Sequence, residues 1–163
     1  MRLFVKCSSR TQPLPRRRWW AAALGVSVLA LQLTFPSLDS ERWSGVWPLL
    51  LLPVIALSLH QLVSDAWVWN RLFRSEGQLD EYERHSRNAF IARAYNLSGG
   101  WALWLLFAAY ILGGGFLKRS AALNPFPEGN AETANVVFFL TLVSAYTYLP
   151  RIVAALSEKD FAE

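Results

Sequence analysis

Hydrophobic residues form four long runs in this chain, each free of Asp, Glu, Lys and Arg. The uncharged stretches number 20 residues between Arg18 and Asp39, 22 between Arg42 and Asp65, 24 between Arg93 and Lys118, and 18 between Glu132 and Arg151. A transmembrane helix needs about 20 mostly apolar residues, whereas a chain of 163 residues has room for one domain. A single small core cannot bury four such runs, so the pattern predicts four transmembrane helices.

The runs favour helices over the strands of a barrel, the other structure that satisfies its own backbone in lipid. Barrel strands alternate apolar and polar residues, and WPLLLLPVIALSL at 47–59 does not alternate. We therefore expect an all-α integral membrane protein with its membrane domain at 19–157. The predicted parts are a basic tail at 1–18, spans at about 19–35, 46–64, 96–116 and 134–157, and a C-terminal tail at 158–163.

Positive charge is concentrated on one side of this predicted topology. Thirteen of the sixteen cationic residues precede the first span, separate the second from the third, or follow the fourth; the others are Arg42, Lys118 and Arg119. The positive-inside rule then places both termini and the 65–93 segment in the cytoplasm. Orientation explains the net charge of +4, so we expect no direct nucleic-acid binding. Arginine outnumbers lysine thirteen to three, which indicates a GC-rich bacterial genome, and we expect the protein in a bacterial inner membrane.

Arginine and tryptophan mark the expected membrane boundaries. Tryptophan is enriched at the interface between lipid and water, and the first run is preceded by RRRWW. A cleaved signal peptide is the alternative interpretation of residues 16–30, but the apolar run continues to Phe35, which favours an uncleaved span. The expected lipid-interface residues are Arg16, Arg17, Arg18, Trp19, Trp20, Trp67 and Trp69.

The segment QLDEYERHSRNAFIARAYN at 78–96 is the most charged part of the chain. Its acids precede its bases at i,i+4 spacing, an order that stabilises a helix: Asp80 with Arg84, Glu81 with His85, and Glu83 with Arg87. The acids also lie where the positive end of a helix dipole favours them. We expect a cytoplasmic helix that starts at Asp80 and leads into the third span. Its candidate partner-docking residues are Asp80, Glu81, Glu83, Arg84 and Arg87.

Polar residues inside the second and fourth spans form two stripes at helical spacing. One contains Ser58, Gln61 and Asp65; the other contains Thr141, Ser144, Tyr148 and Arg151. Ionisable groups inside a membrane usually mark function, so Gln61, Asp65 and Arg151 form a candidate polar cluster. The alternative is that these groups only hold the two helices together, while Arg151 extends to water or a lipid phosphate.

Signs of catalytic or cofactor chemistry are sparse. His60, the histidine of the second span, is the candidate axial ligand for haem or a chlorophyll-type pigment, and a bis-His haem within one chain is excluded. The sequence has one cysteine, Cys7, and it lacks HExxH, CxxC, a phosphate-binding loop and a nucleophile elbow. We therefore expect that the protein is not an enzyme and that it binds no metal and no cofactor.

Residues 78–157 resemble small bacterial four-span membrane proteins of uncharacterised-function families. The features that carry the resemblance are the acidic and arginine-bearing stretch Asp80-Glu81 and Glu83-Arg84, and an alanine-bearing segment just before the third span. The resemblance implies a protein often encoded beside helix-turn-helix regulators, with no catalytic residues established.

These expectations lead to a hypothesis about function. It is a non-enzymatic docking, scaffold or regulatory subunit in the lipid bilayer, whose cytoplasmic face binds a protein or joins a larger membrane complex. The alternatives are an accessory subunit of a transport complex, which would need oligomers or a partner subunit, and a subunit associated with pigment or haem.

Overall fold

The computed structural model describes residues 13–38, 47–64, 75–118, 120 and 122–157. Its α-helices are α1 (Leu14–Thr34), α2 (Leu51–Ser64), α4 (Glu81–Leu97), α5 (Leu103–Gly113) and α6 (Ala131–Ser157). Short 3-10 turns occur at Phe35–Ser37, Trp47–Leu50 and Glu76–Gln78, and a π-helical segment at Ser98–Ala102 joins α4 to α5. These ranges contain no strand, so the prediction of an all-α fold is confirmed.

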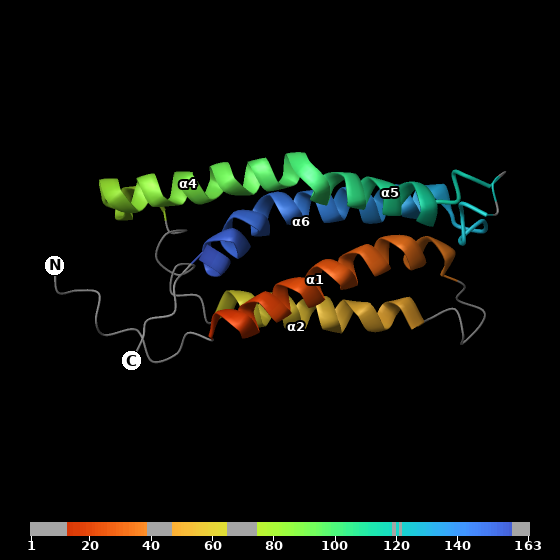
Figure 1. Cartoon of the computed structure of the whole chain (residues 1–163), viewed down its shortest axis with the longest axis horizontal. Helices are drawn as coiled ribbons and strands as arrows, with labels where there is room; N and C mark the ends of the chain where they lie inside the picture. Colours follow the sequence, from red (N-terminus) through yellow and green to blue (C-terminus); the bar gives the residue numbers. More distant parts are fainter. Residues whose placement is uncertain (1–12, 39–46, 65–74, 119, 121, 158–163) are drawn as a thin grey trace.

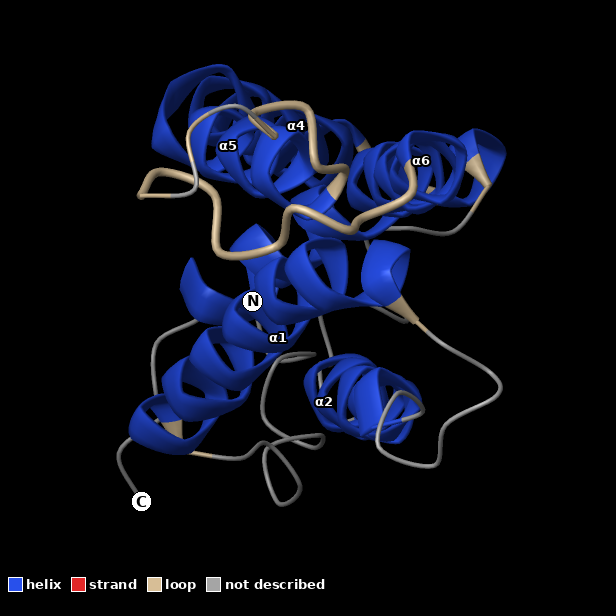
Figure 2. Cartoon of the chain, turned by 90° about the vertical axis from the view of Figure 1, so that its right-hand side faces the viewer, coloured by secondary structure: helices blue, strands red, loops and turns tan. Residues whose placement is uncertain are grey.

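The helices run alternately in opposite directions along one long axis (Figure 1). In the end-on view, α4, α5 and α6 form one layer, α1 lies beneath it, and α2 lies on the far side of α1 (Figure 2). Helix α1 is therefore central, with contacts to α2, α5 and α6. We call the end of the molecule with the starts of α1 and α4 and the end of α6 the charged end. The opposite end, with residues 114–130 between α5 and α6, is the loop end.

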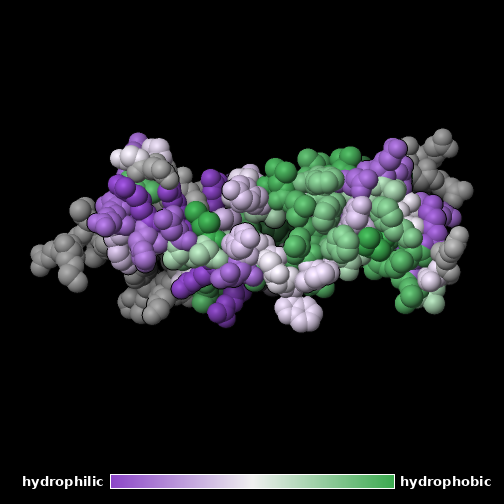
Figure 3. All heavy atoms as spheres, turned by 90° about the horizontal axis from the view of Figure 1, so that it is seen from above, coloured by the Kyte–Doolittle hydropathy of each residue, from purple (hydrophilic) through white to green (hydrophobic). Residues whose placement is uncertain are grey.

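Three helical stretches are long and apolar enough to cross a membrane: Leu14–Ser37, Glu81–Gly113 and Ala131–Ser157. The apolar helix at Trp47–Leu62 is shorter than these. A band of hydrophobic atoms lies between hydrophilic patches at the two ends of the molecule (Figure 3). Such a band is what a lipid-facing surface requires, because lipid cannot solvate charge. The structure thus indicates a membrane protein with at least three helices suited to spanning.

Helix α1 begins at Leu14, whereas the sequence analysis placed its start near Trp19. Pro15 lies in its first turn, where a proline removes no intrahelical hydrogen bond and its fixed φ suits the helix. The helix gives way at Phe35 to a 3-10 turn that contains Pro36, as expected for a residue that cannot continue the α-helical ladder. The arginines at 16–18 are consequently part of α1 and not of a tail.

Pro53 lies at the start of α2 and not in its interior, so it does not kink the helix. Helix α2 begins at Leu51, so Pro53 lies in its first turn, where the ladder of α-helical hydrogen bonds is only starting. Pro48 lies in the preceding 3-10 turn. Pro53 therefore coincides with the change from 3-10 to α-helix. Asp65, Trp67 and Trp69 lie outside the described residues, as does any continuation of this helix.

Helices α4 and α5 form one long rod, interrupted only by the π-helical segment. Within that segment Gly100 has non-helical angles, with φ −98° and ψ −139°. A Cβ at Gly99 or Gly100 would meet no other side chain within 4 Å, so packing does not require glycine there. The third span was predicted at about 96–116, so it takes in the end of α4, the π-helical segment and α5; the break at 98–102 was not predicted.

Candidate functional site

The start of α4 is fixed by a reciprocal pair of hydrogen bonds between Asp80 and Glu83. The backbone N–H of Glu83 donates to Asp80 Oδ1 at 2.7 Å, and the backbone N–H of Asp80 donates to Glu83 Oε2 at 3.3 Å. This is a capping box, which satisfies two N–H groups that a helix start leaves without partners. The prediction that a helix starts at Asp80 is confirmed. Glu83 is buried, whereas Asp80 is exposed, and both hold the first turn of α4.

Two of the three predicted i,i+4 pairs in this region do not form in the structure. Arg84 Nε donates to the carbonyl oxygen of Leu79 at 3.2 Å, so its side chain turns back over the helix start and not to Asp80. Glu81 and His85 are exposed and form no ion pair with each other in the described part of the chain. Arg87 is half-buried, and its pairing with Glu83 stays a prediction. Of the predicted docking residues, Glu81 and Arg84 are therefore the ones that present charge to solvent without supporting the capping box.

A buried arginine connects the two ends of the described chain. Arg17, predicted at the lipid interface, is 5% exposed, and its Nη1 donates to the carbonyl oxygen of Ala155. The last four carbonyls of a helix have no intrahelical partner, and a cation near them is also favoured by the dipole. Arg17 thus caps the end of α6. Its spacing from Leu24 and Ser27, which are also buried on α1, is the sequence signal that could have revealed it.

The neighbours of Arg17 face outward. Arg16, Arg18 and Trp19 are exposed, while Trp20 is half-buried and packs edge-on against Trp19 with ring centroids 4.8 Å apart. Exposed Arg and Trp at a helix end suit the boundary between lipid and water. The assignment of Arg16, Arg18, Trp19 and Trp20 to the lipid interface therefore stays a prediction. Arg17, in contrast, has a structural role as the cap of α6.

The two polar stripes are only partly brought together. Helices α2 and α6 are in contact, and Gln61 and Arg151 are both half-buried. Ser58 is fully buried, with no hydrogen bond to its Oγ among the described residues. On α6, Thr141 Oγ1 donates at 2.8 Å to the carbonyl oxygen of Val137, within its own helix. With Asp65 outside the described residues, the cluster of Gln61, Asp65 and Arg151 remains a prediction.

His60 lies on the outer surface of α2, where it is exposed. A haem or pigment held by His60 would therefore sit at the surface of the bundle and would need a second protein or lipid to cover it. The described residues contain no group of three or more His, Cys, Asp or Glu that could hold a metal ion. Ligation of haem or pigment by His60 therefore stays an alternative prediction.

A closely packed cluster at the loop end was missed by the sequence analysis. Gln32 is fully buried on α1, and its Nε2 donates at 3.2 Å to the carbonyl oxygen of Ala134 on α6. A Cβ at Gly113 would overlap the carbonyl oxygen of Gln32, and one at Gly129 would overlap that of Gly113. The backbone N–H of Asn130 also donates to the carbonyl oxygen of Pro36 at 2.9 Å. Glycine is thus needed here for close backbone approach.

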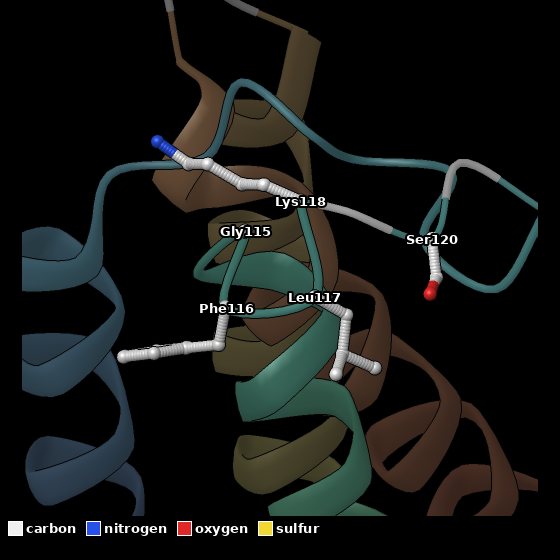
Figure 4. Close-up of a pocket in the computed structure, with 5 residues that line it drawn as sticks. All are labelled: Gly115, Phe116, Leu117, Lys118 and Ser120. Carbon is white, nitrogen blue, oxygen red and sulfur yellow. The ribbon is translucent and has the colours of Figure 1, made fainter.

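The turn after α5 borders an open hollow of about 370 Å³ at the loop end, lined by Gly115, Phe116, Leu117, Lys118 and Ser120. The ring of Phe116 points towards α6, while the amino group of Lys118 points away from the helices (Figure 4). Gly115 has φ +68°, a conformation that favours glycine. The hollow is open and is lined by one short segment of the chain. It is therefore a surface depression and not an enclosed substrate site.

Comparisons with known proteins do not assign this site. No family model matches the chain, and neither a curated protein nor a solved structure matches it significantly. The resemblance to bacterial four-span proteins therefore stays a prediction, and the function has to be argued from the residues.

Proposed function

We propose that this protein is a non-enzymatic docking or regulatory subunit of a bacterial inner membrane, and that its partner binds α4 at the charged end. The proposal includes four spans with both termini in the cytoplasm, so that α4 faces the cytoplasm. The run at 46–64, second in chain order, would be the additional span beside the three long apolar helices. The supporting charge pattern is the excess of Lys and Arg in the segments next to the charged end.

The observation that carries this proposal is the length of the rod that α4 forms with α5. The stretch Glu81–Gly113 contains 33 residues, which at 1.5 Å per residue correspond to about 50 Å. The hydrocarbon core of a bilayer is about 30 Å thick, so about 20 Å of the rod must lie outside it unless the rod is strongly tilted. Figure 1 shows α4 projecting past the ends of α1, α2 and α6 at the charged end. A helix that extends this far into water offers a surface for a partner.

Hydrogen bonds also define where this projecting helix starts. The capping box between Asp80 and Glu83 stabilises the first turn, where a solvent-exposed helix would otherwise fray. Exposed residues of mixed character then follow along α4: Glu81, Tyr82, Arg84, His85, Asn88 and Ile91. An ordered surface with both charged and aromatic groups is typical of protein-binding sites, where Tyr and Arg are enriched.

A pull-down from native membranes tests this proposal. The variant is Glu81→Lys with Arg84→Glu, which reverses exposed charge and leaves Asp80 and Glu83 in place. The matched control is Glu132→Lys, an exposed acid in the first turn of α6 at the loop end. We expect the α4 variant to lose at least one partner that both the wild type and the control retain. Identical partner lists for all three proteins would contradict docking at α4.

A further inference from the structure

The break between α4 and α5 is not explained by packing. Gly100 has non-helical angles there, and a Cβ on Gly99 or Gly100 would meet no other side chain within 4 Å. None of the residues at 98–102 is buried. Sharp bends in helices occur at Gly and Ser pairs and at π-helical insertions, and the segment that begins with Ser98 contains both. What the two glycines supply here is therefore freedom of the backbone.

The helices on either side of the break are held by different parts of the bundle. Helix α5 packs against α1 and α6, and its last residue is Gly113, where a Cβ would overlap the carbonyl oxygen of Gln32. Helix α4 packs chiefly against α6, and the end of α6 bends towards α1, away from the start of α4 (Figure 1). The fully buried apolar residues at α4 are Ala94 and, just before the helix, Leu79. Little apolar area therefore holds α4 against the bundle, whereas α5 is fixed in it.

The break also lies near the expected membrane boundary at the charged end. A Cβ on Gly113 would lie 3.0 Å from the Cα of Leu33, and both α1 and the rod run from the charged end to the loop end (Figure 1). Gly99 lies 14 residues before Gly113, as Trp19 lies 14 residues before Leu33, so the equal rise of the two helices puts Gly99 about level with Trp19. Trp19 and Trp101 are both exposed, and Trp is enriched at the boundary between lipid and water. The break therefore separates the part of the rod that suits lipid from the part that suits water.

We propose that Gly99 and Gly100 form a hinge at the membrane surface. Helix α4 swings on it as a rigid helix between a position against α6 and a position away from α6, while α5 stays in the bundle. Such a hinge needs few residues, because a change of backbone angles at one or two positions moves everything beyond them. The swing uncovers the side of α4 that carries Ala94 and so changes the surface that a partner meets. This regulation rests on the proposed docking at α4, whereas the swing itself needs no partner.

Distances between spin labels on the purified protein in lipid nanodiscs test the hinge. Cys7 is the single cysteine, so the background is Cys7→Ser. The α4–α6 pair carries its labels at the exposed positions His85→Cys and Ser157→Cys, and the α5–α6 reference pair carries them at the exposed positions Ala108→Cys and Val143→Cys. We expect two separate distances for the α4–α6 pair and one narrow distance for the reference pair. A single distance for the α4–α6 pair, as narrow as that of the reference pair, would overturn the hinge.

Replacing both glycines with alanine locates the hinge. Gly99→Ala combined with Gly100→Ala should favour a continuous helix and lower the minor population of the α4–α6 pair at least about fivefold, because alanine is favoured over glycine in a helix. Gly25→Ala is the matched control, since a Cβ on Gly25 of α1 would also meet nothing within 4 Å, and it should leave both populations unchanged. The reference pair should keep its distance in every variant. Two distances that persist in the double variant would overturn a hinge at these glycines. Because no partner is present, a failure of docking in the pull-down would leave this result standing.

Discussion

Arg17, near the start of α1, donates a hydrogen bond to the carbonyl oxygen of Ala155, near the end of α6. The contact joins residues 138 positions apart in the sequence. It places the two ends of the described chain at the same end of the bundle. The small side chains of Ala154 and Ala155, each 1% exposed, let the two helices approach closely enough for this contact.

Replacing Arg17 with methionine should destabilise the protein. Methionine keeps an unbranched chain of similar reach but cannot donate to Ala155, and a hydrogen bond from a charged group contributes about 1.5–3 kcal/mol. We expect a loss of that order in the free energy of unfolding, measured in detergent, with faster amide exchange in the last turn of α6. Arg16→Met is the control because Arg16 is exposed, and it should change stability by less than about 0.5 kcal/mol. Equal losses in both variants would contradict the cap.

Pro150 and Arg17 should be energetically coupled. Pro150 lies inside α6 and removes a backbone hydrogen bond there, and the later half of α6 bends towards α1 (Figure 1). Pro150→Ala restores that hydrogen bond but straightens the helix and draws Ala155 away from Arg17. We expect Pro150→Ala to lower the thermal stability of the wild type and to raise it in the Arg17→Met background. Additive effects in this double-mutant cycle would show that the bend does not serve the cap.

Features that depend on local sequence were predictable. The uncharged runs indicated helices of membrane-spanning character, and Asp80 followed by Glu83 at N3 marks a helix start through a local mechanism. The seven-residue spacing of Arg17 and Leu24 on α1 was also visible, but spacing alone does not say whether a face meets lipid or protein. In a membrane both surroundings are apolar, so hydrophobicity cannot distinguish them.

Features that depend on backbone approach between distant segments were not predictable. Gly113 is the last residue of α5. Its closeness to Gln32 depends on how α1 crosses α5, which no local pattern specifies. The i,i+4 pairing of Asp80 with Arg84 failed for a different, local reason, since the backbone N–H of Glu83 and the carbonyl of Leu79 supply competing partners.

Removing the capping box should release the first turn of α4. Asp80→Ala takes away the oxygen that accepts from the N–H of Glu83, a change that costs about 1 kcal/mol at helix starts. We expect faster amide exchange at residues 81–84, with little change in α5. Asp80→Asn retains an acceptor oxygen and should behave like the wild type, and Glu81→Ala removes an exposed acid as a control. Unchanged exchange in Asp80→Ala would mean that packing, and not the cap, holds this turn.

Gly113 at the loop end and Gly25 inside α1 differ in the room that a Cβ would find. A Cβ at Gly113 would overlap the carbonyl oxygen of Gln32 and lie 3.0 Å from the Cα of Leu33, both backbone atoms that move only if α1 moves. Overpacking of this kind typically costs about 1–3 kcal/mol, so Gly113→Ala should lower the melting temperature in detergent.

Gly25→Ala is the matched control for Gly113→Ala. A Cβ at Gly25 would meet no other side chain or distant backbone atom within 4 Å, and the residue lies inside α1. Alanine is favoured over glycine in a helix interior by about 1 kcal/mol, so Gly25→Ala should leave the melting temperature unchanged or raise it. If both substitutions raised the melting temperature equally, the close contact between α1 and the end of α5 would be wrong. If both lowered it, Gly25 would also lie at a contact, and the exposed side of α1 would have to be covered by another protein.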